Sequence, residues 1–285
     1  MRNTLLDFSQ RRELSLHAAV VADVNSVIAV LGVATIVVGA FARDLHLYYG
    51  SGIAVQRQTE DVDFAFAVES WAEFEALRKR LIESKAFRAV EGEPHRLRHR
   101  NSLPIDLVPF GNIETADRQI AWPPRGDVVM GVFGFREALA STEDILLPEN
   151  VKTSIVSLAS LALLKIVAWD ERHRHSNGKD ASDLMLIVRS YLKAERNMER
   201  FWNEFSEWTE EDSFDLEQSG ARMLGYDIRQ LLDERGVARI AAILEPQASE
   251  RDVGELPQEM GPRSPEHAHR LLRALFAGIV ERVNK

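Results

Sequence analysis

The first half of the chain alternates helical and strand-like patterns of apolar residues. Apolar positions recur at helical spacing up to Gly32, and the β-branched run that follows favours a strand. A later helix is marked at its start by Ser70, an expected N-cap, with Glu73 at the spacing of a capping box. The expected elements are helix 17–32, strand 35–40, helix 41–50, strand 61–68, helix 70–84, and strands 86–91 and 103–111. This order predicts an α/β or α+β sheet domain.

The second half of the chain is almost wholly helical in period. The expected helices span 153–175, 180–192, 198–208 and 267–283. A stretch rich in Pro, Gly and charge, 245–266, reads as a loop before the last helix. The change of pattern predicts an α+β protein, with a mixed-sheet domain over 1–150 and an α-helical domain over 151–285.

Composition narrows the chemistry that the chain can carry. Apolar residues make up 45% and charged residues 28%, as in soluble globular proteins. The absence of cysteine excludes disulfides and thiolate metal sites, so any metal must bind carboxylates or histidines. A net charge of −9 argues against a surface that coats nucleic acid, although a local basic groove remains compatible with it.

One uncharged segment, residues 25–42, approaches the length of a membrane span. Its two glycines, its polar residues and its β-branched second half favour a buried helix followed by a buried strand. The N-terminal residues lack the apolar run and the cleavage site of a signal peptide. We therefore expect a cytoplasmic protein without a membrane partner.

Acidic residues gather at the start of the strand expected over 61–68. Side chains two residues apart on a strand share a face, so Asp61 and Asp63 should project together, whereas Glu60 should point elsewhere. Two neighbouring carboxylates repel each other unless a cation joins them, and oxygen ligands suit Mg²⁺ or Mn²⁺. Chance alone accounts for one Asp-x-Asp in a chain of this composition, so the motif is weak by itself.

Two distant features strengthen the pattern. Asp106 lies inside an apolar strand, where an unpaired carboxylate is costly, although an outward-facing Asp on an edge strand is the alternative. With Asp61 and Asp63 it would form the three-carboxylate cluster that two-metal phosphoryl transfer needs. Gly39 lies at an expected strand-to-helix turn, where a phosphate could approach the backbone, although a tight turn without a ligand is equally compatible.

Two further polar stretches are better explained as exposed structural segments than as functional sites. His173 and His175 lie in an expected exposed loop, and their spacing suits no zinc motif. The basic run 95–100 favours a solvated hairpin flank, and it is also the place where an acceptor nucleic acid would bind a local cationic strip.

Together, "VVGAFARD", "RQTEDVDF" and "IDLVPFG" resemble the nucleotidyltransferase-fold superfamily, in which a glycine turn precedes an Asp-x-Asp strand and a third acid on a later strand. More narrowly, "QRQTEDVDFAF" followed by "LALLKIVAWDERHRHSNGKDASDL" resembles the AbiEii-type nucleotidyltransferases, the toxin components of toxin–antitoxin systems. The resemblance covers roughly residues 31 to 195, and the remainder is not diagnostic.

The resemblance implies an Mg²⁺- or Mn²⁺-dependent enzyme that uses an NTP as substrate. Asp61 and Asp63 would bind the ions, and Asp106 would act as base or metal ligand. The implied substrate-binding residues are Gly39, Ala40, Arg43, Arg57, Thr59, Lys165, Lys179, Asp180 and Asp183. Ala40 departs from the family pattern, which has Gly or Ser at that position, so only backbone donors remain there.

Three functions follow as hypotheses. The first is nucleotide transfer to a hydroxyl acceptor, an RNA or tRNA end or a protein side chain, with an antitoxin protein as partner. The second is transfer to a small molecule of the antibiotic type. The third is a catalytically silent regulatory protein of the same fold.

Overall fold

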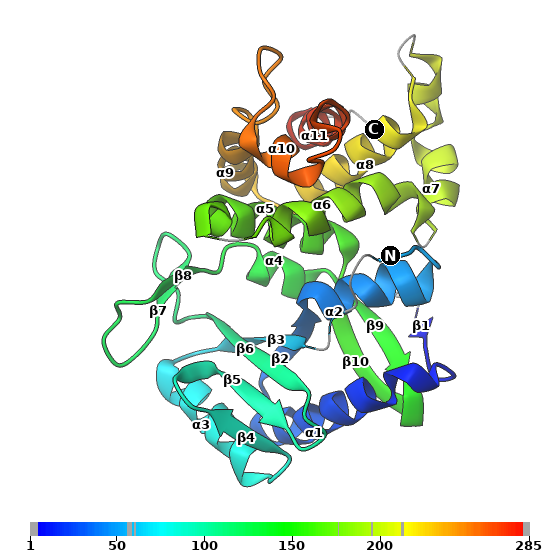
Figure 1. Ribbon diagram of the computed structural model, residues 1–285. Coiled ribbons are helices and arrows are strands. Elements are labelled where there is room, and N and C mark those ends of the chain that lie inside the picture. The colour runs from blue at the N-terminus through cyan, green and yellow to red at the C-terminus, as the bar shows by residue number, and fades with distance from the viewer. Residues whose placement is uncertain are drawn as a thin grey trace. The chain divides into compact units, whose positions relative to one another are not determined.

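The computed structural model describes residues 5–55, 59, 61–175, 177–194, 196–211 and 214–281. Their contacts separate two compact units, one formed by 1–45 and 56–157 and the other by 46–55 and 158–285. The first unit carries the sheet and the second is helical (Figure 1). This arrangement confirms the predicted α+β class, while the domain limits expected from the sequence stay a prediction.

The first unit is built on an eight-stranded mixed sheet in the order β1-β9-β10-β2-β3-β6-β5-β4. Its strands are β1 Leu6–Asp7, β2 Ala34–Val38, β3 Val62–Val68, β4 Phe87–Val90, β5 Glu93–His99, β6 Pro104–Gly111, β9 Thr142–Leu147 and β10 Val151–Val156. A separate hairpin joins β7 Gln119–Ala121 to β8 Val129–Gly131. The helices of this unit are α1 Ser15–Leu31, α2 Gly39–Asp44, α3 Trp71–Glu83 and α4 Phe135–Ala140.

The central strands alternate their side chains between the two faces of the sheet. In β3, Val62, Phe64, Phe66 and Val68 are fully or almost fully buried, and Asp63 lies on the opposite face. Helices α1 and α3 pack against each other and against the sheet (Figure 1). The apolar side chains on one face of β3 are packed in the core and fix the position of the strand. Asp63 extends from its other face.

The expected helix starts are confirmed at Ser70 and modified in one detail. The Ser70 hydroxyl accepts the Glu73 backbone N–H at 3.2 Å, as a capping box requires. The Glu73 carboxylate, however, accepts the N–H of Glu69, one residue before the N-cap, at 2.6 Å. The first bond satisfies an N–H group that the first helical turn leaves without a partner, and the second anchors the residue that precedes the N-cap.

Helix α1 ends as predicted, because Gly32 takes a left-handed conformation at φ 70° and its N–H returns to Ile28. The expectation of a buried helix is only partly right, since Val30 is 68% exposed. By length and composition, the segment Arg12–Leu31 is the one stretch of the described chain apolar enough to cross a membrane, and 33% of its most apolar window is buried.

Three predictions from the pattern are wrong or only partly right. The helix expected from residue 153 begins at Leu158, because β10 pairs with β9 and β2 and continues the sheet. The basic run 95–100 is mostly strand β5, which pairs with β4 on one side and β6 on the other. The expected loop 245–266 contains the short helix α10.

The second unit is a bundle of helices. They are α5 Leu158–Arg172, α6 Lys179–Ser190, α7 Asn197–Glu204, α8 Leu216–Leu231, α9 Glu234–Leu244, α10 Glu255–Met260 and α11 Pro265–Val280, together with a π-helical turn at Leu45–Gly50. Helices α8 and α11 cross closely at two glycines. A Cβ at Gly225 would lie 2.0 Å from the Leu275 carbonyl oxygen, and one at Gly278 would lie 2.0 Å from that of Arg222.

We expect Gly225→Ala to lower the free energy of unfolding by about 2 kcal/mol, because backbone atoms of α11 cannot yield to the added methyl group. Gly220→Ala on the same helix is the matched control. Its Cβ would approach side-chain atoms of Leu192, the nearest at 2.7 Å, which can shift more readily than a helix backbone, while both variants gain the same helix propensity. Urea denaturation of both variants measures the difference, and equal stabilities would contradict the close crossing.

Candidate active site

Four residues on adjacent strands form a row across the sheet. Val38 on β2 pairs with Asp63 on β3, Asp63 with Asp106 on β6, and Asp106 with Arg96 on β5. Residues in register project to the same face, so the side chains of Asp63, Asp106 and Arg96 lie side by side. Asp61 shares this face because it lies two residues before Asp63. The structure thus brings together the three acids singled out in the sequence.

Gly39 is shaped by its contact with Asp63. It follows β2, begins α2 and has a φ of 73°. An added Cβ would lie 1.9 Å from the Asp63 Oδ2 atom, so the carboxylate occupies the space that any side chain would need. Glycine is therefore required both by the left-handed backbone and by the acid against it. Ala40, the next residue, is half-buried at the start of α2.

Within the described residues, Arg96 contacts two of the three acids, and it was not singled out individually in the sequence. Its Nε donates to Asp106 Oδ1 at 2.7 Å, and a terminal nitrogen donates to Asp106 Oδ2 at 2.6 Å. The same terminal nitrogen lies 3.6 Å from Asp61, and the Nε lies 3.5 Å from Glu93. The hydrogen bonds to Asp106 raise the pKa of Arg96 above its ordinary value, so the guanidinium remains charged throughout the pH range of folded proteins.

A buried carboxylate, Asp44, ties α2 to the segment that carries the acids. It accepts a hydrogen bond from Arg43 Nε at 2.8 Å and one from the Thr59 backbone N–H at 3.2 Å. The Thr59 hydroxyl accepts the Asp61 N–H at 3.3 Å. Arg43 is itself buried, 6% exposed, in this network. Arg57 and Glu60 lie outside the described residues.

The acid cluster supplies oxygen ligands and nothing else, as Mg²⁺ or Mn²⁺ requires. The carboxylate of Asp63 is held against Gly39, and Asp106 is its register partner. These residues fit a divalent cation in their chemistry. Yet within the described residues no group of three or more His, Asp or Glu side chains is arranged to hold a metal ion as it stands. Arg96 takes both oxygens of Asp106 instead.

Three residues expected to bind substrate meet within the helical unit. Lys165 Nζ lies 2.9 Å from Asp180 and 2.6 Å from Asp183, and Arg172 donates two hydrogen bonds to Asp180. Burial lowers the pKa of Lys165, but the charges of Asp183 and Asp180 outweigh it and raise the pKa overall. Burial likewise acts to raise the pKa of Asp180, and Arg172 and Lys165 lower it overall. Lys179 is exposed at the start of α6.

We expect Lys165→Met to lower the free energy of unfolding by about 3 kcal/mol, because it leaves the buried Asp180 and the half-buried Asp183 without their shared cation. Arg172→Met is the control. Arg172 is 59% exposed and Asp180 retains Lys165 in that variant, so the loss should be much smaller. Chemical denaturation measures both, and equal losses would contradict the ranking.

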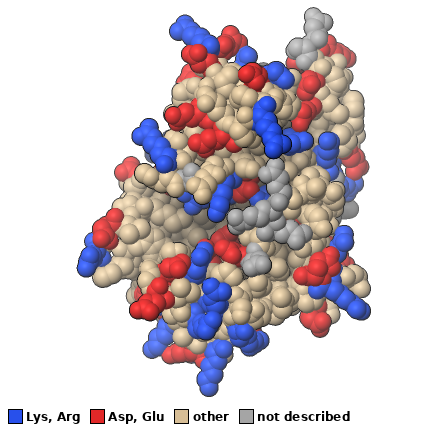
Figure 2. Space-filling view, in the orientation of Figure 1, with Lys and Arg blue, Asp and Glu red and all other residues tan. Residues whose placement is uncertain are grey.

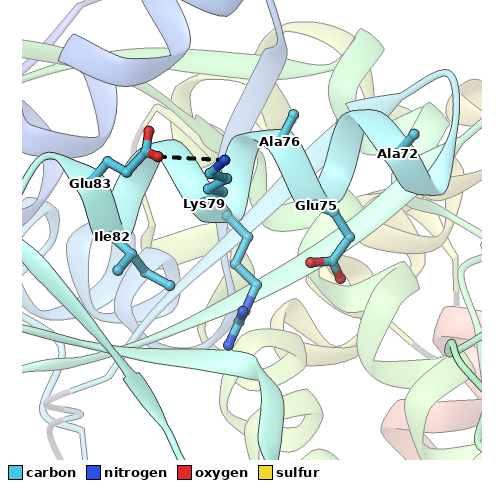
Figure 3. A pocket seen from close by; sticks show the side chains of 7 residues that line it. Ala72, Glu75, Ala76, Lys79, Ile82 and Glu83 are labelled. Atoms are coloured by element: carbon cyan, nitrogen blue, oxygen red, sulfur yellow. Dashed lines mark ion pairs between the residues drawn. The ribbon is translucent and has the colours of Figure 1, made fainter.

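Among the described residues, the surface hollows are lined by residues other than Asp61, Asp63 and Asp106. Figure 2 shows positive and negative side chains interspersed over one face, without a continuous basic stripe. A hollow on the outer side of α3 is lined by that helix alone and carries the Lys79–Glu83 ion pair at 3.7 Å (Figure 3). It contains no cluster of acids, so the row across β3, β6 and β5 remains the candidate site.

Comparison with known proteins bears on this site. The family model of the nucleotidyl transferase AbiEii toxin, type IV TA system, matches residues 28–275. No curated protein matches the sequence. Among solved structures, the solution structure of the antibiotic-resistance factor ANT(2'')-Ia shares 14% identity at a TM-score of 0.36 and covers 68% of this chain and 96% of its own. The crystal structure of ANT(2'')-Ia with adenylyl-2''-tobramycin shares 15% identity at 0.39 and covers 62% and 90%.

These two solved structures are too dissimilar to this chain to indicate its function. The family model, in contrast, spans the glycine turn, all three acids and most of the helical unit. It confirms the resemblance seen in the motifs. The chain belongs to the AbiEii nucleotidyltransferase toxin family.

Proposed function

We propose that this protein transfers a nucleoside monophosphate from an NTP to a hydroxyl acceptor in a metal-dependent reaction. One observation carries the proposal: Asp63 and Asp106 are register partners on adjacent strands, with Asp61 on the same face and Gly39 pressed against Asp63. Acids so placed would repel one another without a cation, and three carboxylates at one point of a sheet are what phosphoryl-transfer sites need. Family membership supports the same reaction class.

The residues divide the work as follows. Asp61, Asp63 and Asp106 would hold Mg²⁺ or Mn²⁺, which supplies charge neutralisation and Lewis acidity when bound. The backbone N–H groups at Gly39 and Ala40 would receive triphosphate oxygens, since neither residue offers a hydroxyl. The acceptor oxygen bonds to the α-phosphorus, the bond to the β-phosphate breaks, pyrophosphate leaves, and the hydroxyl proton passes to Asp106 as base.

The proposed biological role is that of a toxin. The family description names a type IV toxin–antitoxin system, which supports an antitoxin protein as partner. The acceptor in this proposal is an RNA or tRNA end or a protein side chain. Lys165, Lys179, Asp180 and Asp183 are proposed to assist nucleotide binding from the helical unit, with Arg43, Arg57 and Thr59 supporting the acid segment.

Radiolabel transfer tests the proposal. The purified protein is incubated with each NTP labelled at the α-phosphate, with Mg²⁺ or Mn²⁺, and with total RNA or cell lysate. We expect stable label on RNA or protein, and no label from the corresponding γ-labelled NTP, because pyrophosphate leaves. EDTA should abolish the transfer. Label confined to small molecules would identify a different acceptor class, and the absence of any transfer would contradict the proposal.

One observation favours a silent nucleotide-binding protein instead. Arg96 already neutralises Asp106 and lies near Asp61, so part of the charge of the acids is balanced without a metal. Calorimetry separates the two functions. If a non-hydrolysable NTP binds only in the presence of Mg²⁺, the result supports the transferase. If the NTP binds equally well with and without Mg²⁺, and no transfer is detected, the result supports the silent protein.

A further inference from the structure

We propose that Arg96 is a built-in counter-cation that competes with the divalent metal for Asp106 and Asp61, so that metal can load the site only when the guanidinium moves away. The inference rests on the proposed function, and it concerns how metal binding at the same site is regulated. It assigns a role to a residue of the basic run that the family motifs leave without one.

The contact geometry makes Arg96 a direct competitor. Its two hydrogen bonds, at 2.7 and 2.6 Å, form the planar fork that matches a carboxylate, and together they occupy both oxygens of Asp106. A terminal nitrogen lies 3.6 Å from Asp61. The guanidinium therefore spans two of the three acids. A divalent cation bound to those oxygens would face a positive charge at contact distance.

Strand pairing holds Arg96 in this place. Arg96 is the register partner of Asp106, and its neighbour Leu97 is fully buried and pairs with Ile105 on the opposite face. The backbone of β5 thus fixes where the Arg96 side chain begins. While β5 stays paired, the side-chain torsions of Arg96 are what move the guanidinium.

Release of the guanidinium does not require its deprotonation. Its raised pKa keeps Arg96 cationic, so pH change cannot open the site by this route. The side chain is 30% exposed, which leaves it room to turn outward, and Glu93 lies 3.5 Å from its Nε as an alternative partner. A metal ion that takes Asp106 would leave Arg96 paired with Glu93 and water. Competition between two cations is therefore the step that sets metal affinity.

Titration with Mn²⁺ alone, without nucleotide or acceptor, tests the inference. We expect Arg96→Gln to bind Mn²⁺ more tightly than the wild-type protein, on the order of tenfold, because the competing charge is gone. Arg98→Gln is the matched control, since Arg98 lies on the same face of β5 and donates to the Ser102 carbonyl at 2.9 Å. Its Mn²⁺ affinity should equal that of the wild type. Unchanged or weaker Mn²⁺ binding by Arg96→Gln would overturn the inference.

Thermal unfolding of the same variants provides a second, independent test of the competition. In EDTA, Arg96→Gln should melt at a lower temperature than Arg98→Gln, because Asp61 and Asp106 lose the cation that they share. Mn²⁺ should raise the melting temperature of Arg96→Gln more than that of the wild type. An equal rise in both proteins would count against competition.

The outcomes also separate this inference from the proposed function. Transfer activity combined with unchanged Mn²⁺ affinity in Arg96→Gln would overturn the competition and leave the transferase standing. Tighter Mn²⁺ binding in Arg96→Gln without any transfer would support the competition and overturn the proposed function.

Discussion

Asp63→Asn is expected to reduce nucleotide transfer on the order of a hundredfold or more, the loss typical when a charge-stabilising group is removed from an active site. Asparagine keeps the size and the hydrogen-bonding oxygen of aspartate, so it should still fit against Gly39. The substitution removes the negative charge of Asp63, which lies between Val38 and Asp106 in the row across the sheet. Initial rates of transfer from an α-labelled NTP measure the effect.

Asp127→Asn is a suitable control, because Asp127 is exposed between β7 and β8 and lies outside the acid row. It should retain wild-type activity. Circular dichroism and melting temperature should be close to the wild type for both variants. A change of only a few-fold in the Asp63 variant would show that the acid row is not the catalytic centre.

Gly39→Ala should lose comparable activity by a different route. The new methyl group would be placed where the Asp63 carboxylate now lies, with 1.9 Å between Cβ and Oδ2, and one of the two must move. The backbone at φ 73° adds a strain of about 1 kcal/mol for any residue with a side chain. We expect both transfer and stability to fall, with the loss of transfer on the order of a hundredfold.

Gly92→Ala isolates the strain from the clash. Gly92 has a φ of 77°, and an added Cβ would meet nothing within 4 Å. It should therefore lose stability to a similar small extent and keep its activity. If Gly39→Ala behaves in the same way as Gly92→Ala, the contact with Asp63 has no functional role.

The acids of the site were predictable from sequence because their signals are local. The spacing of Asp61 and Asp63 places them on one face of a strand, and Asp106 is conspicuous among Ile105, Leu107 and their neighbours. Glycine at position 39 is equally visible before an expected helix. Only the expectation that Asp106 joins Asp61 and Asp63 depends on which strands are neighbours.

The partners of the acids were not predictable, because they depend on strand pairing. Arg96 lies ten residues from Asp106 and was grouped with a basic run, although the alternation of Arg96, Leu97 and Arg98 has the period of a strand. Asp44 reaches Thr59 across fifteen residues, and its burial follows from tertiary packing. The contacts that neutralise or hold the acids thus arise only when the sheet forms.

Strand β10 illustrates the same limit in the fold. Its Thr, Ser, Ile and Val residues run directly into the apolar helix α5, and the periodicity alone favours one long helix. Residues 151–156 pair with six residues of β9, and this pairing makes the segment a strand. Tertiary contacts overrule local pattern where an apolar run fits both structures.

The order of the sheet also predicts how its two halves fluctuate. Strands β3 and β6 are interior and hydrogen-bonded on both sides, whereas β5 is separated from the sheet edge only by the short strand β4. Amide protons of β3 and β6 should therefore exchange with solvent much more slowly than those of β4 and β5. Asp63 and Asp106 lie on the slowly exchanging strands and Arg96 on a faster one, so transient fraying at the edge would release Arg96 before it disturbs these two acids.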